Sequence, residues 1–336
     1  MPEINPPAQV SRRRAALALD FGRVLEAARR WRPRGPRHAR VDADFCVPGS
    51  QINDPAAFGR FAPGGATRRI LSITGRCPPS WAGKRRAFFL RGLALMGLRG
   101  QPLDVEVLGA RMRLHARSNI WEKRILFTPQ FFDPLEREII APFLAGDCVF
   151  VDVGANFGGY ALWAAGLAGP GSRILAIEPE PAVFERLCFN IRANRTGTVK
   201  ALRTAVADRE GRLRLFYDQR NHGGASICIS RNAPAGGDAV EVPATTLLDL
   251  LARENIERVD VLKVDVAGAE DLVIGPFCDA APEALMPKIV ILNRQRNHWS
   301  VDVSALLRDK GYAARAETAS NLVFTRERAP APGRAS

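Results

Sequence analysis

Residues 148–159 read CVFVDVGANFGG, and this stretch decides the fold. An apolar run broken only by Asp152 ends at Gly154, which is typical of a strand buried on both faces of a parallel sheet. Gly154 and Gly158 then allow a tight turn, because glycine adopts backbone conformations that other residues avoid. The apolar segment 158–168 follows with the character of a helix. The stretch therefore predicts the first strand, turn and helix of an α/β domain.

Strands and helices alternate on both sides of this stretch. Upstream, a Gly turn splits a predicted hairpin, and Asp133-Pro134 provides the N-cap and first residue of a helix. The predicted strands are 148–154, 173–179, 198–206, 213–218, 259–266, 288–293 and 321–326, and the predicted helices are 119–127, 133–144, 158–168, 181–194, 244–256, 269–277 and 303–311. Regular alternation of this kind predicts an open, doubly wound α/β sheet.

The turn 154–158 is the first candidate for ligand binding, because such sheets bind ligands at the carboxyl ends of their strands. Its spacing is G-x-N-x-G, so Asn156 stands where a nicotinamide dinucleotide enzyme has its second glycine. This departure argues against a dinucleotide oxidoreductase. It favours a smaller ligand with a carboxylate and an ammonium group, for which Asp152 offers a negative charge.

Two further carboxylates follow predicted strands. Glu178 ends the segment 173–179, where an acidic side chain can accept hydrogen bonds from both hydroxyls of a ribose; the alternative is a solvated carboxylate before a Pro turn. Asp265, in the segment KVDVAGAE, is expected at the mouth of the same cleft, beside the reacting group. Lys263 lies inside that strand and is expected to pair with a neighbouring carboxylate.

Seven motifs in a fixed order extend this pattern to a family. They are NIWEKRILFTPQFFDPLER, FVDVGANFGGYAL, AIEPEPAVFERLCFNIRAN, AVADREGRLRLF, GGASI, PATTLLDLL and DVLKVDVAGAED. In this order they resemble the S-adenosylmethionine-dependent methyltransferases, and the FkbM family closely, over residues 109–312. The resemblance implies a Rossmann-like class I methyltransferase fold with a seven-stranded doubly wound sheet, and S-adenosyl-L-methionine as the cofactor.

The resemblance also assigns roles to individual residues. It puts Asp265 near the sulfonium, where it is the candidate base for an acceptor hydroxyl, with His222 as the weaker alternative. We expect no metal site. The residues implied in cofactor binding are Asp152, Gly154, Asn156 and Gly158 for the methionine part, Glu178 for the ribose, and Ala207 and Asp208 for the adenine edge.

Two positions depart from the family pattern. The family usually has glutamate where this chain has Ala267, and again at the end of the next strand, where it has Asn293. Two hypotheses follow. The chain is either an O-methyltransferase acting on a sugar, a polysaccharide precursor or a secondary metabolite, or a degenerate relative that binds the cofactor or a partner without methyl transfer.

The charge of the chain is concentrated at its N-terminal end. The net charge is +13, and residues 1–100 carry 19 basic and 6 acidic side chains, whereas residues 101–336 carry 29 of each. We expect a basic, partly disordered extension over 1–100, a methyltransferase domain over 101–325 and a disordered tail over 326–336. An Arg-rich helix at 12–31 is a candidate for binding an anionic surface or a protein partner. The balanced remainder argues against specific nucleic-acid binding.

Cysteine spacing and hydropathy give the expected compartment. The six cysteines form no CxxC pair and have no histidine at metal-ligand spacing, so we expect neither zinc nor disulfides. No apolar run is long enough to span a bilayer, and the start lacks a secretory signal. These observations predict a cytoplasmic protein. A small-molecule or glycan acceptor is what the resemblance to the methyltransferases implies.

Overall fold

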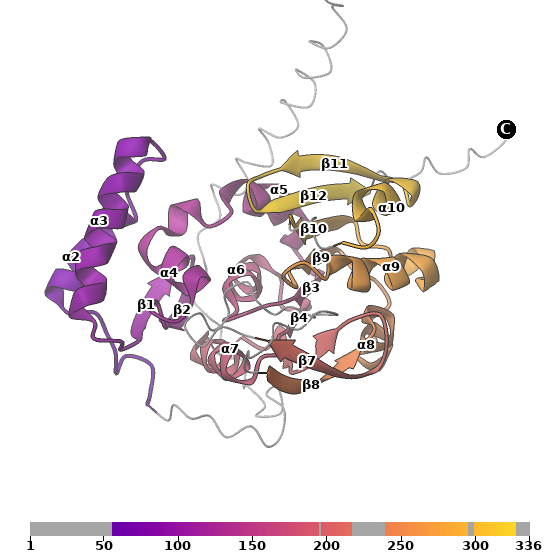
Figure 1. Cartoon of the computed structure of the whole chain (residues 1–336), viewed down its shortest axis with the longest axis horizontal. Helices are drawn as coiled ribbons and strands as arrows, with labels where there is room; N and C mark the ends of the chain where they lie inside the picture. Colours follow the sequence, from indigo (N-terminus) through magenta and orange to yellow (C-terminus); the bar gives the residue numbers. More distant parts are fainter. Residues whose placement is uncertain (1–55, 195, 217–238, 295–298, 327–336) are drawn as a thin grey trace, which may run out of the picture. The chain divides into compact units, whose positions relative to one another are not determined.

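A computed structural model describes residues 56–194, 196–216, 239–294 and 299–326 (Figure 1). The predicted helix at 12–31, His222, the GGASI motif and residues 327–336 lie outside the described residues. None of the described helices is long and apolar enough to cross a membrane.

Within the described residues, seven strands form the central sheet in the order β11-β12-β10-β9-β3-β4-β5. β12 runs antiparallel to both of its neighbours, and the pairs from β10 to β5 are parallel. This confirms the predicted doubly wound sheet. The strands are β3 (Val149–Val153), β4 (Arg173–Ile177), β5 (Val199–Leu202), β9 (Val261–Val264), β10 (Ile289–Asn293), β11 (Tyr312–Glu317) and β12 (Asn321–Arg326).

The strand order reverses between β3 and β9. From β3 the chain continues to β4 and β5 on one side, and β9 then starts the other half of the sheet on the opposite side of β3. Asp152 of β3 lies directly beside Lys263 of β9 in the parallel register. A switch point of this kind is where open α/β sheets bind their ligands, at the carboxyl ends of the strands.

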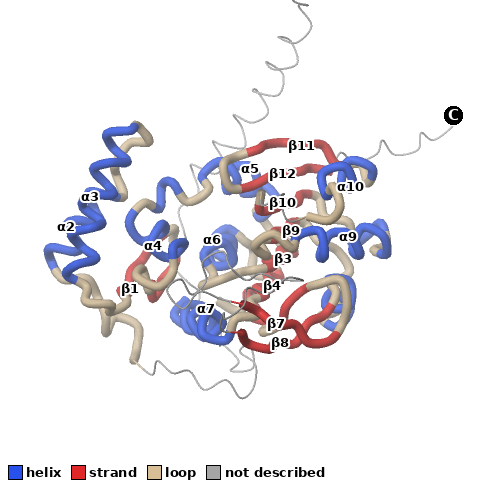
Figure 2. The backbone as a smooth tube through the Cα atoms, viewed as in Figure 1, coloured by secondary structure: helices blue, strands red, loops and turns tan. Residues whose placement is uncertain are grey.

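Helices cover both faces of the sheet (Figure 2). Phe150 points into one apolar layer, and Val149, Val151 and Val153 point into the other, because successive side chains of a strand alternate. The first layer is covered by α5 (Pro134–Leu144), α6 (Gly159–Leu167) and α7 (Pro181–Asn194), and the second by α8 (Leu247–Arg253), α9 (Glu270–Ala280) and α10 (Val303–Asp309).

The segment before the sheet closes one side of the first layer. It comprises the hairpin β1 (Leu103–Val107) and β2 (Ala110–Leu114), the helix α4 (Ile120–Phe127) and the 3₁₀ turn η2 (Pro129–Phe131). Asn190 of α7 accepts a hydrogen bond from the amide of Arg113 at 2.7 Å, which fixes β2 against α7. The predicted hairpin and the two predicted helices are confirmed.

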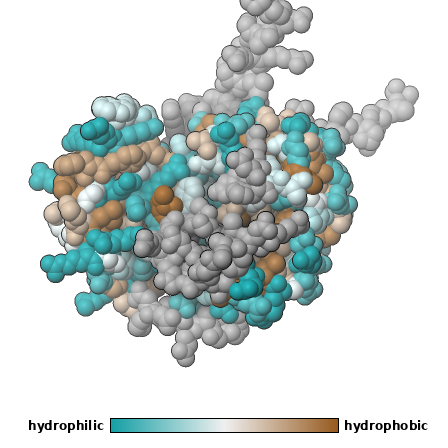
Figure 3. Space-filling view, in the orientation of Figure 1, coloured by the Kyte–Doolittle hydropathy of each residue, from teal (hydrophilic) through white to brown (hydrophobic). Residues whose placement is uncertain are grey.

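Two helices in the N-terminal region were not predicted. α2 (Gly65–Thr74) and α3 (Trp81–Gly97) lie in a stretch that the sequence analysis described as loosely structured. α3 carries apolar residues on its buried and on its exposed side, so no helical period stands out. Figure 3 shows apolar surface beside hydrophilic surface in the part of the view where Figure 1 places α3. The side-chain Nε2 of Gln130 donates to the carbonyls of Thr74 and Cys77 at 2.8 and 3.1 Å, and these bonds connect the α2–α3 segment to η2.

Residues 56–61 also pack on the domain. The Asp104 carboxylate accepts hydrogen bonds from the amides of Gly59 and Phe61, and forms an ion pair with Arg113 at 2.7 Å. The Arg113 guanidinium also donates to the carbonyl oxygens of Ala56 and Ala57. Residues 56–61 of the basic extension are therefore fixed to the hairpin by these hydrogen bonds.

Other differences are local. The predicted strand 198–206 divides into β5 and β6 (Ala205–Val206), and β6 joins β7 (Gly211–Phe216) and β8 (Ala239–Thr245) in a small separate sheet. The helix predicted from residue 244 begins at Leu247, because Thr246 accepts the Asp249 amide as N-cap and the residues before it extend β8. β11 was missed because most of its side chains are exposed, so it lacks a buried apolar pattern.

Candidate active site

The carboxyl ends of β3, β4, β9 and β10 bring together most of the predicted site residues. Asp152 lies near the end of β3, Glu178 directly follows β4, Asp265 directly follows β9, and Asn293 ends β10. The amide of Asp265 donates to the carbonyl of Val153 at 2.9 Å, so the turns after β3 and β9 are in direct contact.

The two glycines of the turn are explained by contacts within the protein. Gly154 has φ of +79°, and a Cβ there would lie 2.0 Å from the carbonyl oxygen of Asp265. Gly158 has φ of +93°, and a Cβ there would lie 2.8 Å from a methyl group of Leu187. The sequence analysis expected a ligand to approach these glycines. The structure gives the closest approach at Gly154 to the neighbouring turn, and ligand contact with either glycine stays a prediction.

Asn156 connects the turn to Glu178. Its φ of +54° lies in the left-handed region, which asparagine tolerates better than most residues. Its amide donates to Glu178 Oε2 at 2.9 Å, and its side-chain oxygen accepts the Nδ2 of Asn119 at 2.8 Å. Asn119 was not predicted as a site residue. Its only sequence signal is its place before helix α4, where it is the N-cap.

Glu178 is buried at the end of β4, with 3% of its surface exposed. Oε2 accepts the amide of Asn156, and Oε1 accepts the amide of Glu180 at 2.9 Å. Burial raises the pKa of this carboxyl to about 7, although both amides favour the charged form. A carboxylate offers about four lone-pair positions, so these two bonds leave capacity for two further hydroxyl donors.

Asp152 and Lys263 form a buried ion pair between neighbouring strands. Lys263 Nζ lies 3.1 Å from Asp152 Oδ1 and 3.7 Å from Asp265 Oδ2. Burial tends to lower the pKa of Lys263, but the two carboxylates outweigh burial and the pKa is raised, so the lysine stays charged. The predicted pairing of Lys263 with a neighbouring carboxylate is confirmed. The contact between Asp152 and a methionine ammonium stays a prediction, because Asp152 is fully buried.

One oxygen of Asp152 is left over in this arrangement. Within the described part of the chain, the buried Oδ2 atom has no hydrogen-bond partner. Burial also raises the pKa of the Asp152 carboxyl, with Lys263 acting in the opposite direction. An unsatisfied acceptor of this kind costs free energy in the absence of a partner. This oxygen is therefore a position that favours a hydrogen-bond donor or a positive charge.

Asp265 is the most accessible acid of the group, with 26% of its side chain exposed. The Nδ2 of Asn293 donates to Asp265 Oδ1 at 2.7 Å, while Lys263 lies on the side of Oδ2. A positive charge and an amide donor therefore hold the carboxylate in one orientation. Asn293 thus has a definite partner at the position where the family has a glutamate.

The turn after β9 contains the second departure from the family pattern. Ala267 has φ of +55°, and its neighbour Gly268 has φ of +101°. The next acid of the motif, Glu270, is buried and accepts the amides of Val266 and Gly268, both at 3.1 Å. Its other oxygen accepts Trp299 Nε1 at 2.7 Å. Glu270 therefore stabilises the conformation of the turn through these three hydrogen bonds. The methyl side chain of Ala267 cannot form a hydrogen bond of this kind.

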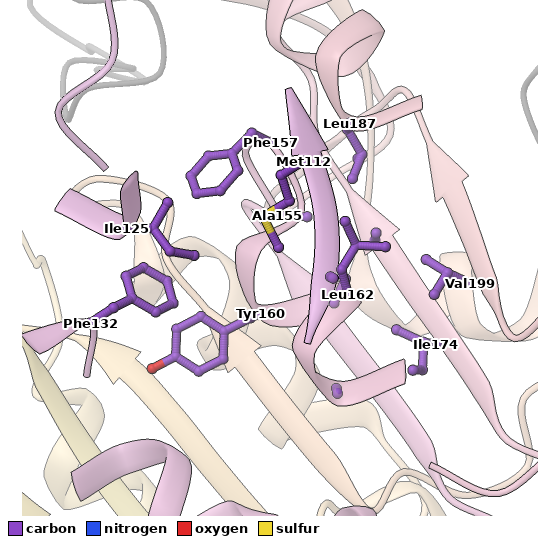
Figure 4. Close-up of a cluster of buried hydrophobic side chains, with 14 of the residues drawn as sticks. Met112, Ile125, Phe132, Ala155, Phe157, Tyr160, Leu162, Ile174, Leu187 and Val199 are labelled. Atoms are coloured by element: carbon purple, nitrogen blue, oxygen red, sulfur yellow. The ribbon is translucent and has the colours of Figure 1, made fainter. Parts of the chain in front are cut away.

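Asp133 and Tyr160 form a second polar group that sequence reasoning missed. Asp133 precedes α5 as predicted, but its side chain makes no capping bond. Its carboxylate accepts the Tyr160 hydroxyl at 3.1 Å and lies 3.3 Å from Arg124. The Tyr160 ring packs beside Phe132 (Figure 4), and Lys263 Nζ lies 5.2 Å from its centre. Asp133 thus contacts Tyr160 at its hydroxyl, and Lys263 lies over the face of the same ring.

The two residues expected at the adenine edge have different environments. Ala207 is buried, and its amide donates to the carbonyl of Thr245 at 2.9 Å in the small sheet. Asp208 is partly exposed and lies 3.7 Å from the guanidinium of Arg209. The backbone amide of Ala207 is thus already bonded, whereas the carboxylate of Asp208 faces solvent. Their contact with an adenine stays a prediction.

Several known proteins resemble this chain. The methyltransferase FkbM domain family matches residues 152–313. Methyltransferase 1 of Beauveria bassiana (strain ARSEF 2860) is 28% identical over 194 residues, which cover 53% of this chain and 77% of that protein. The 31-O-demethyl-FK506 methyltransferase FkbM of Streptomyces tacrolimicus is 28% identical over 229 residues, covering 60% and 86%. Among solved structures, the METTL16 MTase domain is 14% identical, covers 77% of this chain and 86% of its own, and has a TM-score of 0.41.

Proposed function

We propose that this chain, which belongs to the FkbM methyltransferases through residues 152–313, transfers a methyl group from S-adenosylmethionine to an oxygen atom. The acceptor is a hydroxyl group of a sugar, a polysaccharide precursor or a secondary metabolite. The buried carboxylate of Glu178 carries the proposal. It is held by two backbone amides and keeps lone pairs for the two hydroxyls of a ribose.

The residues present fit an adenosyl sulfonium. Three carboxylates, Asp152, Glu178 and Asp265, surround the switch point with one lysine, so the site favours a cationic ligand. Glu178 would hold the ribose, and the raised pKa of its carboxyl is relieved by hydroxyl donors, which favour the charged form. When bound, S-adenosylmethionine supplies an activated methyl group on sulfur.

The chain's own contribution to the chemistry is orientation and proton transfer. Asp265 accepts the proton of the acceptor hydroxyl, and Lys263 and Asn293 hold its carboxylate in one orientation. His222, the other candidate base, lies outside the described residues. Orientation of reacting groups is itself a large effect, worth roughly 7–11 kcal/mol in ideal cases.

We also propose that the enzyme is cytoplasmic. Cys77, Cys148 and Cys278 are free and buried, which suits a reducing compartment.

The function is tested by methyl transfer from S-adenosylmethionine labelled in its methyl group. The full chain is incubated with separate pools of nucleotide sugars, polysaccharides and hydroxylated small metabolites, and the labelled products are identified by mass spectrometry. We expect label on an oxygen atom in one pool, and none with boiled protein. Label found only on nitrogen or carbon acceptors would contradict the proposed chemistry.

The pH dependence of cofactor binding follows from Glu178. The pKa of its carboxyl is about 7 in the free protein, and ribose hydroxyls bind the ionised form. Affinity for S-adenosylhomocysteine is therefore expected to be constant above that pH and to fall as the pH drops, by up to about tenfold per unit. Binding near pH 6 should release a proton. Titration calorimetry in two buffers of different ionisation enthalpy measures both effects.

The matched control for this pH dependence is Glu178→Gln, which keeps the size of the side chain and removes its titration. Its affinity should be lower than that of the wild type at pH 8 and independent of pH between 5.5 and 8. A wild-type affinity that is equally flat would contradict the role of Glu178.

Substitutions of Asn293 distinguish an active methyltransferase from the degenerate alternative, which binds the cofactor or a partner without methyl transfer. In the proposed enzyme Asn293 orients Asp265, so Asn293→Ala should lower kcat about tenfold, the value of one hydrogen bond to a charged group. Asn293→Glu should lower kcat at neutral pH by at least as much, because two carboxylates in contact cannot both ionise. An increase in kcat for Asn293→Glu, above all together with Ala267→Glu, would instead support a degenerate wild type.

A further inference from the structure

We propose that helix α3 is a docking surface for a membrane with anionic lipids. Five large apolar side chains of α3 are exposed, namely Trp81 (75%), Phe88 (50%), Phe89 (66%), Leu93 (43%) and Met96 (66%). A soluble protein leaves few such side chains in solvent on one helix, and a contiguous group of them marks an interaction site. The same region shows apolar surface beside hydrophilic surface (Figure 3).

The exposed residues lie on one side of the helix. At 3.6 residues per turn, Trp81, Phe88, Phe89 and Met96 fall within one arc, and Leu93 extends it. The buried residues Gly83, Ala87 and Ala94 fall on the opposite side. α3 therefore has two apolar sides, one packed on the domain and one without a partner among the described residues.

Positive charges border the exposed side. Residues 56–103 contain nine arginine and lysine residues and no aspartate or glutamate. Arg86 flanks the apolar arc on one edge and Lys84 and Arg91 on the other, while the guanidinium of Arg85 lies 5.3 Å from the ring of Trp81. Apolar residues between cations with long stems are the pattern of a helix that lies in the interface of an anionic bilayer.

The charge pattern favours lipid over the other occupants. A second copy of this chain seated on the same surface would bring two acid-free, strongly basic segments together, which repel each other. A nucleic acid would need a row of cations along the surface to follow its phosphates. Arg85 is the one cation within the arc of the described helix, and its guanidinium lies over the ring of Trp81 among the apolar side chains. Anionic headgroups satisfy the flanking cations while the acyl region takes the apolar side chains.

The surface is fixed on the domain. Ser80 caps α3 by accepting the amide of Gly83, and Arg117 donates to the carbonyl of Leu95 at 3.1 Å. The Lys84 ammonium lies 5.8 Å from the ring of Phe131 in η2, two residues before Asp133. The docking surface therefore contacts the segment of chain that leads to Asp133.

The test is sedimentation of the full chain with vesicles of phosphatidylcholine alone or with one quarter phosphatidylglycerol. We expect binding to the anionic vesicles only, weakened by added salt. Lys84→Gln/Arg85→Gln/Arg86→Gln should lower the partition coefficient about 100-fold, at about fivefold per charge. Trp81→Ser/Phe88→Ser/Phe89→Ser should lower it at least about tenfold. All variants are first checked for unchanged thermal unfolding.

The matched control is Arg212→Gln/Arg253→Gln/Arg308→Gln, which removes three exposed charges elsewhere in the domain and should change vesicle binding less than threefold. Three results would overturn the proposal. The first is vesicle binding by both α3 variants at the level of the wild type, which would assign the binding to residues 1–55. The second is binding to RNA or DNA in preference to vesicles. The third is a dimer that dissociates when Trp81, Phe88 and Phe89 are substituted.

Discussion

Gly154→Ala is expected to lower the free energy of unfolding by more than about 4 kcal/mol and to abolish cofactor binding in any protein that still folds. The added Cβ would lie 2.0 Å from the carbonyl oxygen of Asp265, an atom of the backbone that has no flexible side chain to move aside. The residue also has φ of +79°, which L-residues rarely adopt. The two turns after β3 and β9 would have to separate, and both contribute to the site.

Gly166→Ala is the control for this substitution. Gly166 lies inside α6, and a Cβ there would meet no atom within 4 Å. Alanine should therefore stabilise the protein by about 0.5–1 kcal/mol through its higher helix propensity. Urea unfolding and titration with S-adenosylhomocysteine measure both variants. Wild-type stability and binding in Gly154→Ala would show that the turns are not in the contact described.

Asp265→Asn is expected to lower kcat by about 10²- to 10⁴-fold and to leave the dissociation constant of S-adenosylhomocysteine, which lacks the sulfonium charge, within about threefold. Asparagine keeps the shape of the side chain and can still accept the bond from Asn293, but it cannot take a proton from a hydroxyl. The separation of kcat from binding is the essential result, because a residue that merely supports the fold would affect both.

The control for Asp265 is Asp309→Asn, which removes the same charge at the exposed end of α10 and should leave both constants unchanged. Single-turnover measurements with labelled S-adenosylmethionine, on the acceptor found in the labelling experiment, give the rate of the chemical step. A rate for Asp265→Asn within a factor of three of the wild type would remove Asp265 as the base.

The central sheet could be predicted because its strands are buried on both faces. The runs around Val149–Val153 and Val261–Val264 are almost continuously apolar, so they stand out without knowledge of their neighbours. β11 could not be predicted, since it is an edge strand with mostly exposed side chains. α3 was not predicted, because the apolar residues on two of its sides hide the periodicity by which a helix is usually recognised.

The site was predictable where a residue ends a strand, and less so where its role depends on a distant partner. Glu178 and Asp265 follow strands, and the topology brings them to one edge of the sheet. The bond from Asn293 to Asp265 spans 28 residues, and the bond from Asn119 to Asn156 spans 37, so neither leaves a local signal. The close approach of Gly154 to the Asp265 carbonyl could not be predicted for the same reason, because that atom belongs to another turn.

The account depends most on Glu178 and the turn at Asn156 binding the adenosyl group together. Calorimetric titration of S-adenosylhomocysteine into the full chain, into Glu178→Ala and into the exposed-charge control Glu257→Ala tests this directly. We predict one site per chain in the wild type and the control, and an affinity about 100-fold lower in Glu178→Ala, from the loss of two hydrogen bonds to a charged group. Equal affinity in all three proteins, or no binding to the wild type, would contradict it.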